Sequence, residues 1–88
     1  MTKQELINLI TNLKQGKEIT LASKEWQFGI IKDQMFGTEQ IFFGAYGSDV
    51  QAKYTDYNTA EEIAEAIEQY IIEFDGRNTY QLSDYKVS

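Results

Sequence analysis

The spacing of the apolar residues changes twice along this chain, and this pattern constrains the fold more than any other feature. At the N-terminal end they recur every three or four residues, the period of an amphipathic helix, at Leu6, Leu9, Ile10 and Leu13. Residues 17–55 instead alternate between apolar and polar, as half-buried strands do. The helical period then returns. This order of helix, strands and helix predicts an α+β fold.

The first helix is predicted from its boundary signals as well as from its period. Thr2-Lys3-Gln4-Glu5 fits a capping box, in which the Thr hydroxyl and the Glu carboxylate each satisfy a free backbone N–H. Gly16 stands where a residue of left-handed conformation commonly closes a helix. We therefore predict a helix over residues 3–15.

The second helix has the same type of start and end. Its capping box is Thr59-Ala60-Glu61-Glu62, and Gly76 follows as the closing residue, which predicts a helix over residues 60–74. At 100° per residue this helix has an apolar stripe that must lie on the sheet. The stripe comprises Ala60, Ile63, Ala64, Ile67, Tyr70, Ile71 and Phe74.

Between the helices, four stretches of alternating residues predict strands. Their inward positions are Ile19 and Leu21; Trp26, Phe28 and Ile30; Ile41, Phe43 and Ala45; and Val50, Ala52 and Tyr54. A two-residue turn at Gly47 and Ser48 would close the last hairpin and pair Phe43 with Ala52 on one face. We expect an antiparallel sheet of three to four strands with both helices on the same face. In the short tail, residues 77–88, a strand, a helical turn and a coil remain open.

Composition predicts one folded domain over residues 1–88. Hydrophobic content of 42% and twelve aromatic residues argue against disorder. Cysteine is absent, which excludes a disulfide framework and agrees with a reducing compartment. The N-terminus has no continuous apolar stretch of the kind a signal peptide needs, and no run is long enough to span a membrane. We therefore expect a cytoplasmic protein without membrane contact.

The residue types that most catalysis requires are missing. Histidine and cysteine are both absent, so the common nucleophile and general-base arrangements that need them cannot form, and a metal site loses its two best ligand types. Carboxylates are abundant, but those on the second helix look equally exposed to solvent, which argues against an acid/base pair. The glycines form no phosphate-binding loop ahead of a helix. Lysines are scattered and give no basic footprint, which argues against direct nucleic-acid binding. We expect a non-enzymatic protein without a cofactor or metal.

The negative charge is confined to the second half of the chain. Residues 1–48 contain five acidic and five basic residues, whereas residues 49–88 contain nine acidic and three basic ones and carry the whole net charge of −6. From Asp56 to Asp75 there are seven carboxylates and no base. A local field of this kind can steer a cationic partner.

The second helix presents these charges opposite its apolar stripe. Glu61 belongs to the first helical turn, where the helix dipole favours negative charge, but Glu73 lies at the other end, where the dipole disfavours it. Glu65 repels its neighbours along the helix, and a helix selected for stability alone would place Lys among them. We call this surface the acidic flank and predict that it binds a partner through Glu61, Glu65, Glu68, Ile72, Glu73 and Asp75.

We expect a non-catalytic binding protein whose acidic flank contacts a basic surface of another protein. In one version of this hypothesis, that surface is the nucleic-acid channel of an enzyme that the protein blocks. In size, charge and helix-sheet-helix order the chain resembles small phage-encoded inhibitors that mimic nucleic acid and block restriction and CRISPR nucleases. This likeness covers architecture and carries no motif. The alternative is an interaction module or subunit, including a homodimer, that uses the exposed sheet face or the tail, with the acid serving solubility. If lysines folded over from the same chain neutralised these glutamates, the flank would instead be an internal brace and the inhibitor hypothesis would fall with it.

Overall fold

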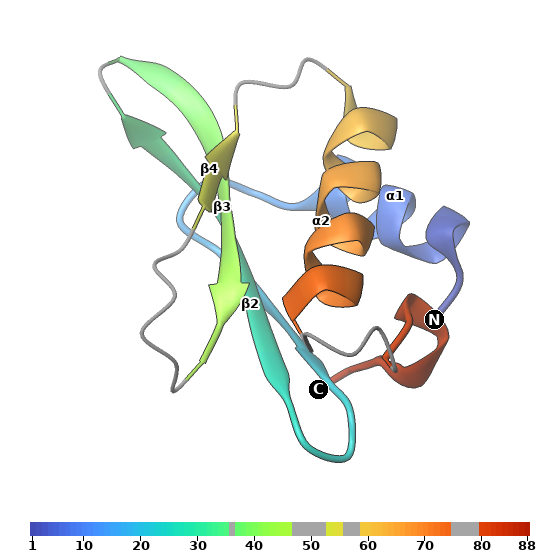
Figure 1. Ribbon diagram of the computed structural model, residues 1–88. Coiled ribbons are helices and arrows are strands. Elements are labelled where there is room, and N and C mark those ends of the chain that lie inside the picture. Colours follow the sequence, from blue (N-terminus) through green and yellow to red (C-terminus); the bar gives the residue numbers. More distant parts are fainter. Residues whose placement is uncertain (36, 47–52, 56–58, 75–79) are drawn as a thin grey trace.

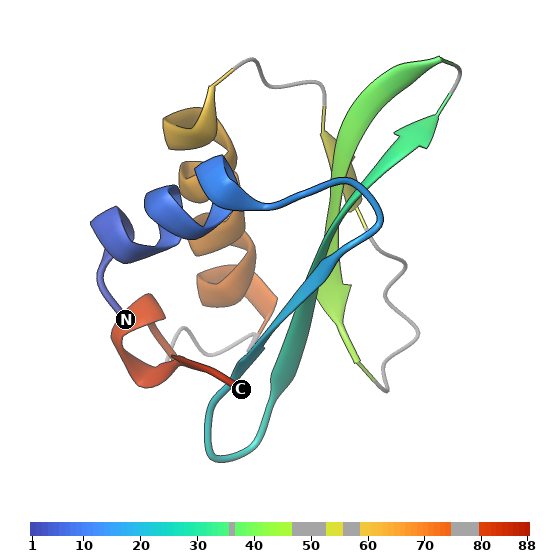
Figure 2. The same cartoon turned by 180° about the vertical axis from the view of Figure 1, so that it is seen from behind.

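The sheet and the two helices form two layers (Figures 1 and 2). The computed structural model describes residues 1–35, 37–46, 53–55, 59–74 and 80–88. Both helices cover the same face of an antiparallel sheet, which confirms the α+β fold predicted from the sequence. Within the described ranges no helix is both long enough and apolar enough to cross a membrane.

Helix α1 spans Lys3–Asn12 and begins with the predicted capping box. The Thr2 hydroxyl accepts a hydrogen bond from the Glu5 backbone N–H at 3.1 Å. The helix ends three residues earlier than predicted, because Leu13 is already extended (φ −68°, ψ 127°). Gly16 does adopt a positive φ of 79°, but in the turn before the first strand, where its N–H donates to the Lys32 carbonyl oxygen at 2.7 Å. The predicted left-handed conformation of Gly16 is therefore confirmed, but this residue forms part of the turn and does not close the helix.

Helix α2 spans Ala60–Phe74, as predicted. Thr59 caps it, since its hydroxyl accepts from the Glu62 backbone N–H at 3.1 Å. The predicted stripe faces the sheet: its members Ile63, Ala64, Ile67, Tyr70 and Ile71 are buried, and Ala60 is half-buried. The side chain of Phe74 lies outside the described part of the structure.

The strands follow the order β4-β3-β2-β1-β5, and every pairing is antiparallel. The first four are β1 (Glu18–Ala22), β2 (Gln27–Met35), β3 (Thr38–Ala45) and β4 (Lys53–Thr55). Strands β2 and β3 are the longest and form the centre of the sheet, with Met35 paired to Thr38 beside the turn. Gly37 in that turn has a positive φ of 77°, a conformation that glycine adopts at no steric cost.

The register of the β3–β4 hairpin differs from the prediction by one residue. Phe43 pairs with Lys53 and Phe42 with Tyr54, so the expected pairing of Phe43 with Ala52 is wrong. A two-residue turn determines the register only when the strands pair without interruption up to it, and β4 covers three residues. The predicted turn at Gly47 and Ser48 lies outside the described residues.

The described part of the tail is an integral part of the fold. Leu82–Asp84 form the 3-10 helix η1, and Lys86–Val87 form β5, which pairs with β1. Leu82 and Tyr85 are buried at 4% and 1% exposure. The structure thus contains both the helical turn and the short strand that the sequence left open, and the tail adds a fifth strand to the four expected.

A cluster of aromatic rings joins the sheet, α2 and the tail. The Phe28 ring on β2 forms edge-to-face pairs with Tyr70, at a centroid distance of 5.5 Å, and with Tyr85, at 5.3 Å. Tyr70 also meets Phe43 on β3 at 5.7 Å. Edge-to-face pairs of this kind add to the burial energy of each ring. We call these four residues the aromatic cluster.

Replacing Tyr85 by Ala should lower the free energy of unfolding by about 3–5 kcal/mol, as for other large buried aromatic side chains. Urea unfolding followed by circular dichroism measures this change. Val87→Ala is the matched control, because this side chain is 54% exposed in the same tail. It should change the free energy of unfolding by less than about 0.5 kcal/mol. Equal effects of the two substitutions would show that the tail does not contribute to the core.

Candidate protein-binding site

Helix α2 places the described residues of the acidic flank on the side away from the sheet. Glu61, Glu65 and Glu73 are exposed, whereas Glu68 and Ile72 are half-buried. The geometry follows from the burial of the apolar stripe, which turns the opposite face of the helix outward. Asp75, the last residue of the predicted site, lies outside the described residues.

The acidic flank is not bare, contrary to the expectation from the sequence. Lys3, the first residue of α1, reaches across to α2 and forms an ion pair with Glu65. Its Nζ also lies 3.9 Å from a carboxylate oxygen of Glu68. The four described carboxylates of the flank and the Lys3 ammonium group, which contacts two of them, sum to a formal charge of −3.

The ion pair shifts the titration of both partners. The hydrogen bond from Lys3, followed by one from the Gln69 amide at 3.3 Å, lowers the pKa of Glu65 below its usual value. The same hydrogen bond raises the pKa of Lys3. Both side chains remain substantially in solvent, at 42% exposure for Lys3 and 50% for Glu65. An ion pair this exposed contributes little net stability, because water and salt screen it.

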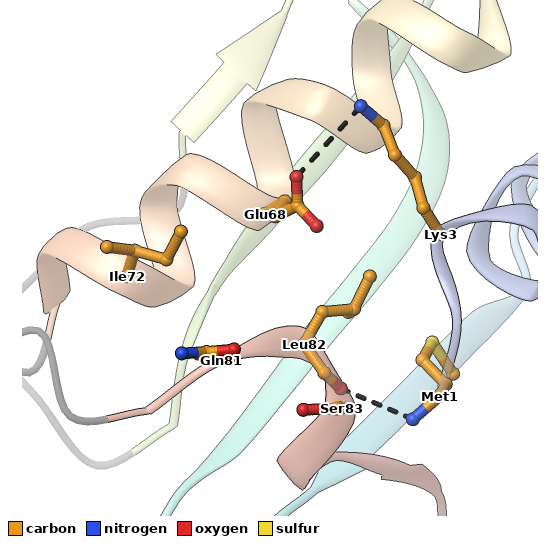
Figure 3. A pocket seen from close by; sticks show the side chains of 7 residues that line it. All are labelled: Met1, Lys3, Glu68, Ile72, Gln81, Leu82 and Ser83. Carbon is orange, nitrogen blue, oxygen red and sulfur yellow. Dashed lines mark hydrogen bonds and ion pairs between the residues drawn. The ribbon is translucent and has the colours of Figure 1, made fainter.

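A hollow lies beside the flank, between α2, the N-terminus and the tail (Figure 3). Its volume is about 290 Å³. Figure 3 shows Lys3 and Glu68 at one end, joined by their ion pair, and Ile72 on the next turn of α2. The complete lining is Met1, Lys3, Glu68, Ile72, Gln81, Leu82 and Ser83.

Met1 holds the tail side of this hollow in place through hydrogen bonds to backbone carbonyl groups of the tail. The Met1 amino group donates to the Tyr85 carbonyl oxygen at 2.6 Å. It also donates to the Leu82 carbonyl oxygen at 3.3 Å, a contact drawn in Figure 3. Within the tail, the Gln81 backbone N–H donates to the Asp84 carboxylate at 2.8 Å. The walls of the hollow are therefore held in place by several independent contacts.

The sheet face away from the helices is a second candidate surface. Ile31 and Phe42 are half-buried there, and Tyr46 is 46% exposed. These three residues border a shallow hollow of about 190 Å³ that also includes Gly29. A Cβ atom on Gly29 would lie 2.5 Å from the Tyr46 hydroxyl oxygen, so the glycine lets this ring lie across the strand.

Possible metal ligands and the buried phenol of Tyr70 are two further chemical features of the described part of the chain. No group of three or more His, Cys, Asp or Glu side chains there is placed to hold a metal ion. Burial raises the pKa of Tyr70, whose phenol is protonated at neutral pH in any case, and its ring belongs to the buried core. The arrangement on α2 can bind a cation by charge and hydrogen bonding.

Sequence reasoning identified Glu68 and Ile72 but missed the residues opposite them. Lys3 stands 62 positions before Glu65, and Gln81, Leu82 and Ser83 come from the tail. No local pattern marks such partners, because they meet only when α1 and the tail pack against α2. The positive charge of Lys3 was the one signal in the sequence, and it stands in a half of the chain whose charges sum to zero.

The Lys3–Glu65 pair predicts a specific titration change. In a Lys3→Gln variant the pKa of Glu65 should rise toward its ordinary value, measured by carboxyl carbon NMR. Because the folded-state pKa is depressed, the stabilisation from this pair is present at neutral pH and lost as the pH falls through the folded pKa. The difference in unfolding free energy between Lys3→Gln and the original protein should therefore shrink in acid. Lys14→Gln is the control, because it removes a positive charge elsewhere in the N-terminal half of the chain, and it should leave the pKa of Glu65 unchanged. An equal effect of the two substitutions on Glu65 would contradict the pairing.

Comparisons with protein-family models, with curated proteins and with solved structures give no significant match, so the site is interpreted from its own geometry.

Proposed function

We propose that this chain is a non-catalytic binding protein whose acidic flank docks on a basic surface of a protein partner. The observation that carries the proposal is the charge imbalance on α2: among the described residues Lys3 is paired with Glu65 and Glu68, and no ion pair is seen for Glu61 or Glu73. Exposed like charges along one helix repel each other. A partner with Lys or Arg side chains would relieve this repulsion.

Helix stability does not account for the position of Glu73, which supports a role of this residue in binding. It is exposed in the last turn of α2, which contains no basic residue to balance the negative end of the helix dipole. Glu61 and Glu62 in the first turn are favoured by the same dipole and need no further explanation. The carboxylates at the C-terminal half of α2 are thus the ones for which binding gives the better account.

The ion pairs of Lys3 affect how a partner can bind the acidic flank. The pair is exposed, so a partner's cation can exchange with the Lys3 ammonium at small cost. An inhibitor that fills the nucleic-acid channel of an enzyme needs a row of free carboxylates in place of phosphates. If the protein is an inhibitor of this kind, Lys3 must break its ion pairs with Glu65 and Glu68 when the complex forms.

Affinity capture from native host lysate, with and without phage infection, tests the proposal. Proteins held by the acidic flank should be basic and should dissociate as the salt rises from about 50 mM to about 500 mM, where exposed charges are screened within a few ångströms. The double variant Glu65→Gln/Glu68→Gln should lose them at low salt. Reversal of both residues to Lys should have the stronger effect.

The matched control is Asp33→Asn/Glu39→Gln, which removes the same charge from exposed positions on β2 and β3, outside both the acidic flank and the shallow hollow of the sheet face. This control should retain the captured proteins. Equal loss in both double variants would mean that net charge, and not the acidic flank, holds the partner, and the proposal would fail.

The outer sheet face is the second candidate, favoured by the exposure of Tyr46 beside Phe42. Binding there, including self-association, rests on apolar contact and should persist at high salt. Phe42→Ala should weaken such a complex but leave binding through the acidic flank intact. Sedimentation at several protein concentrations distinguishes a homodimer from a complex with another protein.

A further inference from the structure

The hollow beside α2 is smaller than a typical small-molecule site. Its volume of about 290 Å³ lies just below the range of roughly 300–1,000 Å³ that is typical of small-molecule sites. We propose that this hollow receives an arginine side chain of the protein partner, with its guanidinium group on Glu68. This inference rests on the proposed function, since it names the partner group that the acidic flank selects.

Glu68 has hydrogen-bonding capacity left for such a group. Its carboxylate is 28% exposed at one end of the hollow, and the nearest approach of Lys3 to it is 3.9 Å. The closer ion pair of Lys3 goes to Glu65. A carboxylate can accept two parallel hydrogen bonds from a guanidinium fork, an arrangement that a lysine cannot reproduce.

The remaining walls suit the aliphatic stem of an arginine. Ile72 is half-buried on the turn of α2 that follows Glu68, and the buried side chain of Leu82 faces the same space from the tail (Figure 3). Long cationic side chains commonly lay their methylene groups on such apolar surface while the charge meets a polar group. Ser83 and Gln81 provide polar groups at the tail side.

Lys3 supplies independent evidence that this place holds a side-chain cation. It comes from another element of the same chain and positions its ammonium group between Glu65 and Glu68. An incoming guanidinium would bind Glu68 while Lys3 keeps Glu65. Arginine is also the cation most enriched at the energetic centres of protein interfaces, since it is weakly hydrated and binds carboxylates in a planar geometry.

The test is an NMR titration of the full ¹⁵N-labelled chain with N-acetyl-arginine amide. The lysine and citrulline amides serve as comparison probes, because citrulline keeps the shape of arginine without its charge. Arginine should shift the backbone amides of Glu68, Ile72 and Ser83 in a saturable manner. Lysine should bind more weakly and citrulline should give no saturable shift.

Two variants test the residues assigned to the hollow. Glu68→Gln should weaken arginine binding by roughly tenfold or more, as expected for the loss of a charged hydrogen-bond partner. Ile72→Ala should weaken it by a smaller factor. Glu73→Gln is the control, since it removes the same charge from α2 outside the hollow, and should leave the affinity within about twofold. Lys3→Gln should strengthen binding because it removes the competing cation.

The failure of this inference can be separated from the failure of the proposed function. Equal shifts from arginine and citrulline, no saturable shift in the hollow, or equal effects of Glu68→Gln and Glu73→Gln would each overturn the arginine site. If salt-dependent capture through the acidic flank persists in that case, the proposed function stands without it. If arginine binds in the hollow but capture is insensitive to salt and to Glu65→Gln/Glu68→Gln, the proposed function is the part that fails.

Discussion

The edge-to-face packing of Phe28 against Tyr70 and Tyr85 is the contact on which the rest of the structure depends. It connects three elements that are distant in sequence, namely β2, α2 and the tail, within one buried cluster. Because Tyr85 is fixed there, the preceding residues Gln81 to Ser83 are held beside α2 and complete the hollow. The candidate site is thus built on the core, although none of its charged groups belongs to the core.

The electrostatic arrangement of α2 follows from the same packing. One face is occupied by the buried stripe, so every charged residue of the helix must lie on the remaining surface. Lys3 reaches that surface because α1 packs beside α2. A single exposed cation of this kind lowers the repulsion among the glutamates but does not remove their field, which extends over about 8–10 Å at moderate salt.

The sequence predicted those features that depend on local patterns. The boxes at Thr2 and Thr59 located both helix starts, and the period of α2 identified its buried stripe. The end of α1 was misplaced because Gly16 has the conformation of a closing residue but serves a turn. The register of β4 and the pairing of Lys3 with Glu65 were not predictable, since both depend on how distant elements pack. The acidic flank was found from charge spacing, whereas its hollow required the path of the tail.

The contact between Met1 and Tyr85 joins residues 84 positions apart, and α1 rests on a helix formed much later in the chain. During translation α1 therefore emerges long before its packing partners, α2 and residues 80–88. Contacts of such sequence separation slow folding, because closing the long intervening loop costs chain entropy. The native arrangement, including the hollow, can be completed only once residues 80–88 have left the ribosome, and until then the apolar side of α1 is accessible to chaperones.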